Sequence, residues 1–248
     1  MKIGVYGLGR FGFFWSELLA QKYDVSGYNR SSLKKFPKKV SIVDENLILQ
    51  CDVLFLCVSI SSLKSVLESI TGRINPDCLV FDTCSVKVYP AKLMKDILPD
   101  SVDIIATHPM FGPDSGKNGV KNLPIVFIPV RDRRGYTNIW KKIFIDIGMK
   151  VIAITADEHD RGAALTQGVT HFIGRVLNGL ELKDSEIATA GYKSLLAIVE
   201  QTCNDPLQLF MDLQHYNPYT HKMRQSLNES LKKTMNMLSA ADPERDIF

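Results

Sequence analysis

The sequence predicts an α/β protein in which a doubly wound, mainly parallel sheet precedes an all-helical C-terminal domain. A glycine-rich turn follows the first apolar run, apolar runs then alternate with helical stretches as far as residue 156, and no clear strand signal appears from residue 157 onward. Alternating strands and helices favour a parallel sheet, because each parallel pair needs a crossover connection. We therefore expect one domain at residues 1–156 and a second at 157–248.

The chain opens with an apolar strand, KIGVY at residues 2–6, and the glycine turn GLGRFG follows at once at 7–12. Phe11, Phe14 and Leu18 then recur at helical spacing. Strand, glycine turn and helix in this order are typical of the start of a Rossmann sheet.

The remaining strands of the first domain are short apolar runs. VLFLCV at 53–58 is apolar throughout, which is typical of a strand covered on both faces. Further strands are predicted at 23–28, 79–82, 103–106, 125–130 and 150–154, and helices near 61–71, 87–98 and 136–147.

Two apolar stripes at helical spacing characterise the second domain. The first stripe comprises Leu165, Val169, Phe172, Val176 and Leu180, and the second Met223, Leu227, Leu231, Met235 and Leu238. So small a helical domain buries such stripes either internally or against a second copy, and two-fold dimers are the commonest oligomers. We expect a homodimer through this domain, with burial inside one chain as the alternative.

Composition limits the classes of function. The 248 residues are 45% hydrophobic and carry a net charge of +3, too small an excess to predict nucleic-acid binding but compatible with small anionic ligands. The five cysteines include no CxxC pair and predict free thiols, and no metal site is expected. No apolar stretch is long enough to span a bilayer, and the first strand begins at Lys2, so we expect no membrane association and a cytoplasmic protein.

The glycine turn predicts a dinucleotide site. Gly7 permits the tight turn, Gly9 lets the backbone approach the pyrophosphate, and Gly12 lets helix and strand pack closely. The helix that follows offers unpaired N–H groups to the phosphates. The predicted cofactor-binding residues are Gly7, Leu8, Gly9, Arg10, Phe11, Gly12, Asn29, Arg30, Ser31, Cys57, Val58 and Ser59.

The end of the second strand predicts which cofactor binds. An acidic residue there would accept hydrogen bonds from the ribose of NAD, but this chain has Asn29, Arg30 and Ser31. A guanidinium binds a 2′-phosphate through charge-assisted hydrogen bonds. The sequence therefore predicts NADP.

Two polar side chains follow neighbouring strands of the predicted sheet. Ser85 follows the strand at 79–82, and His108 follows the strand at 103–106. Ligands of doubly wound sheets bind at the carboxyl ends of the strands, so both side chains are expected near the nicotinamide.

Four segments resemble the prephenate/arogenate dehydrogenase family, and most closely its plant-like arogenate branch. They are DTCSVK (82–87), THPMFGPDSGKNG (107–119), EHDRGAALTQGVTHFIGRVL (158–177) and GYKSLLAIVEQTCNDPLQLF (191–210). The resemblance covers nearly the whole chain. It implies oxidative decarboxylation of a cyclohexadienol: a hydride moves to C4 of the nicotinamide, carbon dioxide leaves, and the ring becomes aromatic.

The resemblance implies roles for the polar residues. His108 is the expected base, which suits an imidazole that is largely neutral at pH 7, and Ser85 orients the reacting groups. The role of Lys87 stays open, with a structural salt bridge as one reading. The predicted substrate-binding residues are Ser115, Lys117, Gln167, His171, Lys193 and Asp205.

Asp205 bears on the choice between arogenate and prephenate. In the plant-like branch an acidic residue in this segment favours arogenate, whose ammonium it can pair with. Asp205 followed by Pro206 is also a common helix start, with Asp as the N-cap. We expect the conversion of L-arogenate to L-tyrosine, and prephenate dehydrogenation is the alternative.

One departure from the family concerns the ring carboxylate. Many bacterial prephenate enzymes place an arginine shortly after the segment that corresponds to Gly191–Lys193. In this chain no arginine lies between Lys193 and Arg224. Candidate cations for binding the ring carboxylate are Lys117, Arg161, Arg175, Lys193 and Arg224.

Two alternative functions are compatible with the same predicted fold. The chain is then either a different NADP-dependent dehydrogenase or imine reductase, or a non-catalytic NADP sensor.

Overall fold

A computed structural model describes residues 1–241 of the chain, which form two compact units. The first unit is Met1–Asp160, and the second begins at Arg161. The sequence-based boundary between 156 and 157 stays a prediction, and each unit is described by itself.

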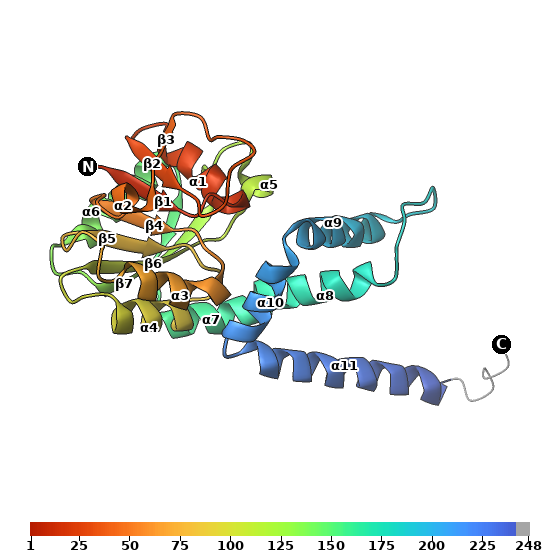
Figure 1. Ribbon diagram of the computed structural model, residues 1–248. Helices are drawn as coiled ribbons and strands as arrows, with labels where there is room; N and C mark the ends of the chain where they lie inside the picture. The colour runs from red at the N-terminus through yellow and green to blue at the C-terminus, as the bar shows by residue number, and fades with distance from the viewer. Residues whose placement is uncertain (242–248) are drawn as a thin grey trace. The chain divides into compact units, whose positions relative to one another are not determined.

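An eight-stranded sheet in the order β3-β2-β1-β4-β5-β6-β7-β8 forms the centre of the first unit. From β3 to β7 this order can be followed downward in Figure 1. Every pair is parallel except β6 and β7, which run antiparallel. The strands are β1 (Ile3–Tyr6), β2 (Val25–Tyr28), β3 (Val40–Ile42), β4 (Val53–Leu56), β5 (Leu79–Asp82), β6 (Asp103–Pro109), β7 (Pro124–Arg131) and β8 (Lys150–Ile152).

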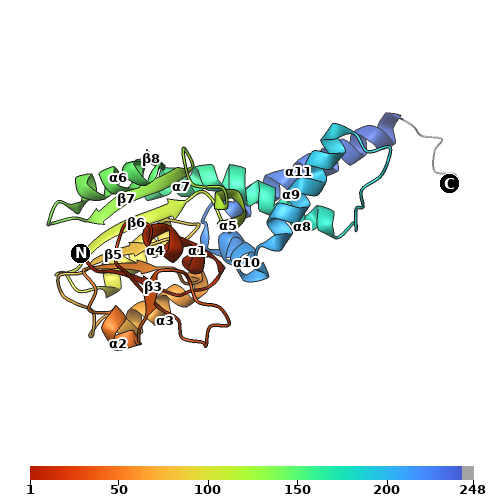
Figure 2. The same cartoon turned by 90° about the horizontal axis from the view of Figure 1, so that it is seen from above.

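Helices cover the sheet on both sides, as Figure 2 shows for α3 and α6. They are α1 (Arg10–Leu19), α2 (Glu45–Ile48), α3 (Ile60–Ile70), α4 (Val88–Ile97), α5 (Pro113–Gly116) and α6 (Tyr136–Ile147). The expected doubly wound, mainly parallel Rossmann-type fold is confirmed. The sequence did not predict β3, α2 or α5.

Aromatic side chains from α1, α6 and the central strands build one continuous core. Phe55 of β4 and Phe81 of β5 stack with ring centroids 4.6 Å apart, and Trp15 and Trp140 pack on Phe55 at 5.6 and 5.5 Å. All four side chains are fully buried. The apolar character of β4 and β5 on both faces therefore follows from their central positions in the sheet.

The second unit is entirely helical in the part that the structure describes. α7 (Ala156–Ala163) crosses the division between the units and continues through a π-helical turn at Ala164–Gly168 into α8 (Val169–Asn178). α9 (Ala190–Asn204), α10 (Leu207–Tyr216) and α11 (Thr220–Ala241) follow. No helix within residues 1–241 has the length and the apolar character that crossing a membrane requires.

A glycine permits close packing of α8 on α9. A Cβ atom at Gly174 would lie 2.1 Å from the hydroxyl oxygen of Thr202. Thr202 is fully buried, and its hydroxyl donates to the carbonyl of Ile198 one turn earlier in α9. Any larger residue at 174 would therefore force the two helices apart.

Candidate active site

Two of the three glycines in the 7–12 turn are required by the fold itself. Gly7 has φ +98°, and a Cβ there would lie 2.6 Å from the carbonyl oxygen of Cys57. A Cβ at Gly12 would lie 1.9 Å from the carbonyl oxygen of Gly7. The turn between β1 and α1 thus closes only when both positions lack a side chain.

Gly9 differs from both, because among residues 1–241, its own chain neighbours aside, no atom lies within 4 Å of the position its Cβ would take. It precedes α1, whose first turn contains no acidic residue and whose N-cap makes no side-chain hydrogen bond within the described residues. Backbone N–H groups at such a helix start attract anions. The open space at Gly9 and the uncapped helix fit the pyrophosphate of a dinucleotide.

Asn29 fixes this turn against the end of β2. Its side-chain oxygen accepts a hydrogen bond from the backbone N–H of Leu8 at 2.9 Å, and its amide donates to the carbonyl of Ser31 at 2.8 Å. Arg30 and Ser31 are exposed. Asn29 and Leu8, whose side chain is buried, thus have structural tasks, while Arg30 and Ser31 are accessible to a ligand.

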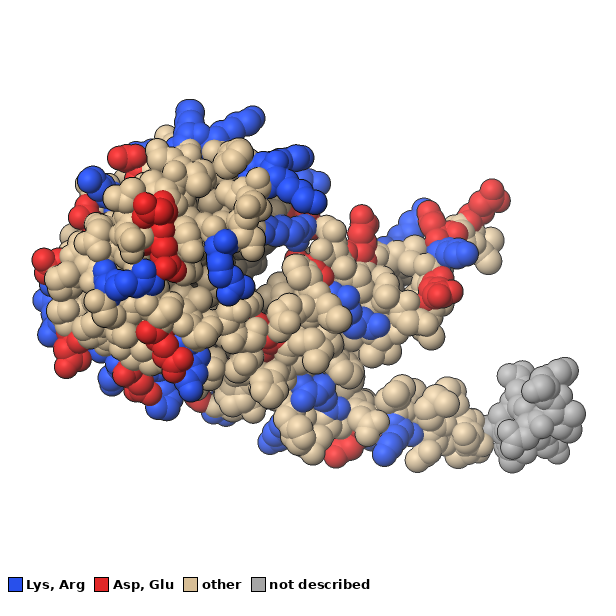
Figure 3. Space-filling view, viewed as in Figure 1, with Lys and Arg blue, Asp and Glu red and all other residues tan. Residues whose placement is uncertain are grey.

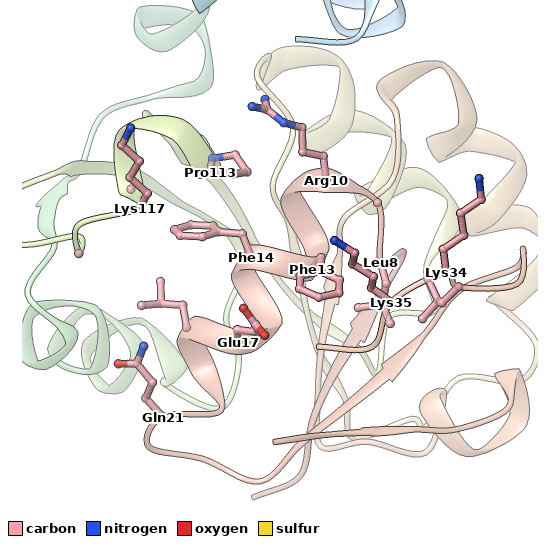
Figure 4. A pocket seen from close by; sticks show the side chains of 15 residues that line it. Leu8, Arg10, Phe13, Phe14, Glu17, Gln21, Lys34, Lys35, Pro113 and Lys117 are labelled. Carbon is pink, nitrogen blue, oxygen red and sulfur yellow. The ribbon is translucent and has the colours of Figure 1, made fainter. Parts of the chain in front are cut away.

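An open groove of about 790 Å³ runs along α1 beside the glycine turn. Figure 4 shows Lys34 and Lys35 on one side of α1 and Lys117 on the other, with Arg10 between them. Figure 3 shows lysine and arginine side chains gathered where α1 and α5 lie. Lys34 and Lys35 were not predicted as ligand residues, because in the sequence they lie beyond the second strand and only the fold brings them to the groove.

The other predicted cofactor residues lie close to this turn. Phe11 is half-buried and stacks on Trp15 with ring centroids 5.6 Å apart, so its side chain belongs to the core. Cys57 and Val58 follow β4 and are partly buried, and Ser59 is the exposed N-cap residue of α3. Burial raises the pKa of the Cys57 thiol to about 12, so the group remains neutral beside the turn.

His108 and Ser85 occupy the ends of neighbouring strands. β5 and β6 are parallel partners, with Asp82 opposite Ala106. β6 extends to Pro109, beyond the predicted strand end at 106, so His108 is the next-to-last residue of the strand and is 4% exposed. Ser85 follows β5 and is 6% exposed. The Ser85 hydroxyl is buried without a hydrogen-bond partner among the described residues. A buried hydroxyl of this kind fits a site completed by a ligand.

Lys87 forms a buried ion pair with Asp82 near the strand ends that hold Ser85 and His108. Its ammonium donates to the Asp82 carboxylate and, at 2.5 Å, to the carbonyl of Thr107. Asp82 also accepts a hydrogen bond from the backbone N–H of Thr107 at 3.2 Å. Lys87 and Asp82 are both fully buried. The structural reading of Lys87 is therefore correct: it joins the ends of the strands that present Ser85 and His108.

A second histidine contacts His108. Nδ1 of His108 lies 2.9 Å from Nε2 of His159, and Nδ1 of His159 lies 2.7 Å from the Asp160 carboxylate. His159 is 4% exposed and Asp160 fully buried. Neither residue was predicted, because in the sequence they resemble the polar start of a surface helix.

The segment after His108 is tied to α1. Arg10 pairs with Asp114 of α5 at 2.5 Å. The Ser115 hydroxyl accepts from the N–H of Gly112 at 3.0 Å, so it stabilises the start of α5. Lys117 lines the groove along α1. Of these predicted site residues, Lys117 therefore contributes positive charge to the groove, Arg10 pairs its charge with Asp114 beside the glycine turn, and Ser115 shapes the loop.

In the second unit, buried polar groups line one face of the helix that contains the π turn. Gln167, His171 and Arg175 follow at intervals of one helical turn, and each has a buried polar atom without a partner among the described residues. Burial lowers the pKa of His171, while the negative charge of Asp205 acts in the opposite direction. His171, Arg175 and Asp205 thus form one electrostatic cluster.

Asp205 lies between α9 and α10, and its carbonyl accepts a hydrogen bond from Arg175 at 2.8 Å. The expected helix start, with Asp205 as the N-cap, is wrong: Pro206 is the N-cap residue of α10, and that cap makes no side-chain hydrogen bond. The backbone of Pro206 is extended, with φ −55° and ψ 139°, as an N-cap residue requires, so the helix starts one residue later than expected.

The remaining candidate cations of this unit have different surroundings. Lys193 is exposed in the first turn of α9. The Arg224 guanidinium donates to the side chain of Gln214 at 2.8 Å, and Arg161 lies over the ring of Tyr219. Among the described residues, no group of three or more histidine, cysteine, aspartate or glutamate side chains is arranged to hold a metal ion.

A Rossmann-type sheet with a nucleotide-binding glycine turn and a following helical unit defines the general class of this chain. The profile of the prephenate dehydrogenase nucleotide-binding domain matches residues 20–153, and that of the TYRAAT1-like C-terminal domain matches 176–246. The chain is 37% identical to arogenate dehydrogenase 2, chloroplastic, from Arabidopsis thaliana, over 95% of this chain and 70% of that protein. It is 39% identical to Arabidopsis arogenate dehydrogenase 1, chloroplastic, over 88% of this chain but 36% of the relative.

Solved structures with the same fold include prephenate dehydrogenase from Aquifex aeolicus in complex with hydroxyphenyl propionate and NAD⁺. Its TM-score is 0.74 at 16% identity, over 98% of this chain and 92% of that chain. Synechocystis arogenate dehydrogenase has a TM-score of 0.69 at 21% identity, over 98% and 93%. With the profile and the sequence relatives, we conclude that the chain belongs to the prephenate dehydrogenase family, in its plant-like arogenate dehydrogenase branch.

Proposed function

We propose that the chain catalyses the NADP-dependent oxidative decarboxylation of L-arogenate to L-tyrosine, a step of tyrosine biosynthesis. The observation that carries the proposal is that His108 and Ser85 stand at the ends of adjacent parallel strands, in the unit that also holds the glycine turn. Both Arabidopsis relatives are arogenate dehydrogenases, which supports this choice of substrate.

In the proposed reaction His108 removes the proton of the ring hydroxyl. A bound nicotinamide supplies the hydride acceptor at its C4. The ring carboxylate leaves as carbon dioxide, its bonding electrons complete the aromatic ring, and His108 returns the proton to the ring oxygen. The unpartnered Ser85 hydroxyl is available to hydrogen-bond the reacting groups and hold them in place.

The proposed cofactor is NADP. Exposed Arg30 and Ser31 directly after β2 support this choice, as do the cations that line the groove beside the turn. Related yeast enzymes carry the name prephenate dehydrogenase [NADP(+)], whereas the Aquifex enzyme was solved with NAD⁺.

Arogenate rather than prephenate is proposed because of the charge near His171. Arogenate has an ammonium where prephenate has a keto group, and the Asp205 carboxylate acts electrostatically in this cluster. Prephenate is the second candidate, because relatives in the same family carry prephenate dehydrogenase names. Replacing Asp205 with asparagine should move the ratio of kcat/KM towards prephenate, and an unchanged ratio would remove Asp205 from substrate selection.

The test of the proposed activity is formation of NADPH and carbon dioxide from arogenate, with prephenate assayed in parallel. His108→Asn should lower kcat by about 10²–10⁴-fold with little change in NADP affinity, because a positioned base contributes a factor of this size. Turnover of neither substrate by the unmodified chain would favour another dehydrogenase, an imine reductase or a non-catalytic NADP sensor. Comparable turnover in the variant would exclude His108 as the base.

We also propose that the chain is a homodimer through its helical unit. Much of both apolar stripes stays exposed in one chain: Leu165, Val176 and Leu180 on the first, and Leu231, Met235 and Leu238 on the second. A second copy of the same unit is the proposed cover for these faces.

We further propose a reducing, cytoplasmic compartment for this chain. The five free cysteines support this proposal.

A further inference from the structure

Three side chains form a hydrogen-bonded chain that ends on the predicted base. It runs from His108 in β6 to His159 in α7 and on to Asp160, through contacts of 2.9 and 2.7 Å. The two imidazole rings meet at 73°, with centroids 5.1 Å apart. All three residues belong to the first unit and are at most 4% exposed.

The carboxylate at the end of this chain is held by α4. Asp160 accepts hydrogen bonds from the backbone N–H groups of Lys87 and Val88 at 2.7 and 2.9 Å. These donors belong to the start of α4, where the helix dipole also favours a negative charge. Both carboxylate oxygens of Asp160 therefore accept backbone hydrogen bonds, and one of them also lies 2.7 Å from Nδ1 of His159.

The acceptor at one end determines the protons along the chain. Because both oxygens of Asp160 accept from backbone N–H groups, Nδ1 of His159 is the donor in its contact with this carboxylate and carries a proton. In neutral His159 the lone pair is then on Nε2, and that atom accepts from Nδ1–H of His108. Neutral His108 must in turn have its lone pair on Nε2. Of the two tautomers of His108, this arrangement selects the one whose basic nitrogen is remote from His159.

We propose that His159 and Asp160 are positioning residues that hold His108 in the Nε2-basic tautomer and share its charge after protonation. The part of this inference that concerns proton transfer during the reaction rests on the proposed function. The assignment of the His108 tautomer does not. When Nε2 of His108 takes the hydroxyl proton, the proton on Nδ1 moves towards Nε2 of His159. The positive charge then lies next to the Asp160 carboxylate, and the return of the substrate proton reverses both transfers.

The charged groups around the pair come from several elements. His108 from β6 and Asp160 from its own helix contact His159, and the first N–H groups of α4 donate to Asp160. The Lys87 ammonium is bound by the Asp82 carboxylate at the end of β5. Asp160 is therefore a carboxylate that can compensate a proton on the histidine pair.

The first experiment compares His159→Gln and His159→Ala with the unmodified chain. A glutamine side-chain oxygen can accept from Nδ1–H of His108, whereas alanine cannot. We expect kcat to fall about 10²-fold in His159→Ala and by less in His159→Gln, with little change in KM. The acid limb of the pH–rate profile should move to lower pH in both, because the link to Asp160 is lost. Thermal unfolding and NADP binding serve as folding controls, and His221→Gln, at an exposed histidine of α11, is the matched substitution.

The second experiment needs no turnover. Two-bond ¹H–¹⁵N correlation spectra of the imidazole rings report which nitrogen of His108 carries the proton. We expect Nδ1–H in the unmodified chain and in His159→Gln, and a mixture of both tautomers in His159→Ala. An Nε2–H signal for His108 in the unmodified chain would overturn the proposal, as would unchanged kinetics and tautomer in His159→Ala. If neither arogenate nor prephenate is turned over, the proposed function fails while these spectra still decide the role of His159 and Asp160.

Discussion

Arg30 follows β2 directly and is exposed, next to the turn that Asn29 fixes. Charge-assisted hydrogen bonds from a guanidinium to a 2′-phosphate contribute about 1.5–3 kcal/mol. Arg30→Ala should therefore raise the Kd for NADP by about ten- to hundredfold and leave the Kd for NAD nearly unchanged. Isothermal titration with both cofactors measures this, with Arg133→Ala as an exposed arginine in another loop. Equal losses for the two cofactors would exclude Arg30 as the phosphate ligand.

His171 makes the stability of the second unit depend on pH. Burial lowers its pKa in the folded chain, so below about pH 6.5 the unfolded chain takes up a proton that the folded chain resists. The stabilisation is present above pH 6.5 and is lost as the pH falls towards the lowered pKa. Thermal unfolding between pH 8 and pH 5 should show a smaller acid loss of Tm in His171→Gln than in the unmodified chain. A parallel loss in both would show that other groups cause the acid sensitivity.

At the level of single residues, sequence reasoning located the ends of strands better than the contacts between side chains. The polar residues after the strands at 79–82 and 103–106 were found because parallel strands end at one edge. His159 was missed, since its partner His108 is 51 positions away and its neighbours are polar. The position of Lys87 in the sequence also gave no indication of its full burial.

The β1–α1 turn offers a test of two glycines with different tasks. Gly12→Ala should destabilise the fold by about 1–3 kcal/mol or more, because its Cβ would meet the backbone of Gly7 at 1.9 Å. Gly9→Ala should leave stability unchanged, because the space around that position is open, and should weaken NADP binding. Chemical unfolding and cofactor titration of both variants separate these effects. Normal NADP affinity in Gly9→Ala would contradict a close approach of the pyrophosphate.

Elements with strong periodicity were predictable, and short elements were not. The helices expected near 61–71 and 136–147 correspond to α3 and α6, whose apolar residues repeat along one face. β3 is a three-residue edge strand with an exposed serine and isoleucine, so its sequence carries no burial pattern. The π turn at Ala164–Gly168 also gave no signal, because apolar spacing does not distinguish it from an α-helix.

For the molecule as a whole, the apolar stripe of α11 predicts self-association. Leu231, Met235 and Leu238 are 61%, 57% and 65% exposed. We expect the unmodified chain to sediment as a dimer and the double variant Leu231→Glu/Met235→Glu as a monomer. Gln225→Glu/Ser226→Glu adds the same charge to exposed polar positions of this helix as a control. A monomer in the unmodified chain at micromolar concentration would contradict the proposed dimer.

The family and the doubly wound fold were accessible from sequence, because the glycine turn and the alternation of elements are local patterns. The conformation of the second unit depends on contacts that are distant in sequence. Gly174 illustrates this dependence, because it meets Thr202 of another helix.

The buried ammonium of Lys87 can report how often the first unit opens. Its nitrogen donates to Asp82 and Thr107 and is fully buried, so an amine-reactive reagent can modify it only while the first unit is transiently unfolded. Exposed lysines such as Lys34 and Lys193 would be modified at once. The rate of labelling at position 87, followed by peptide mass spectrometry, would thus measure how often the strand ends separate, and a bound cofactor should slow it.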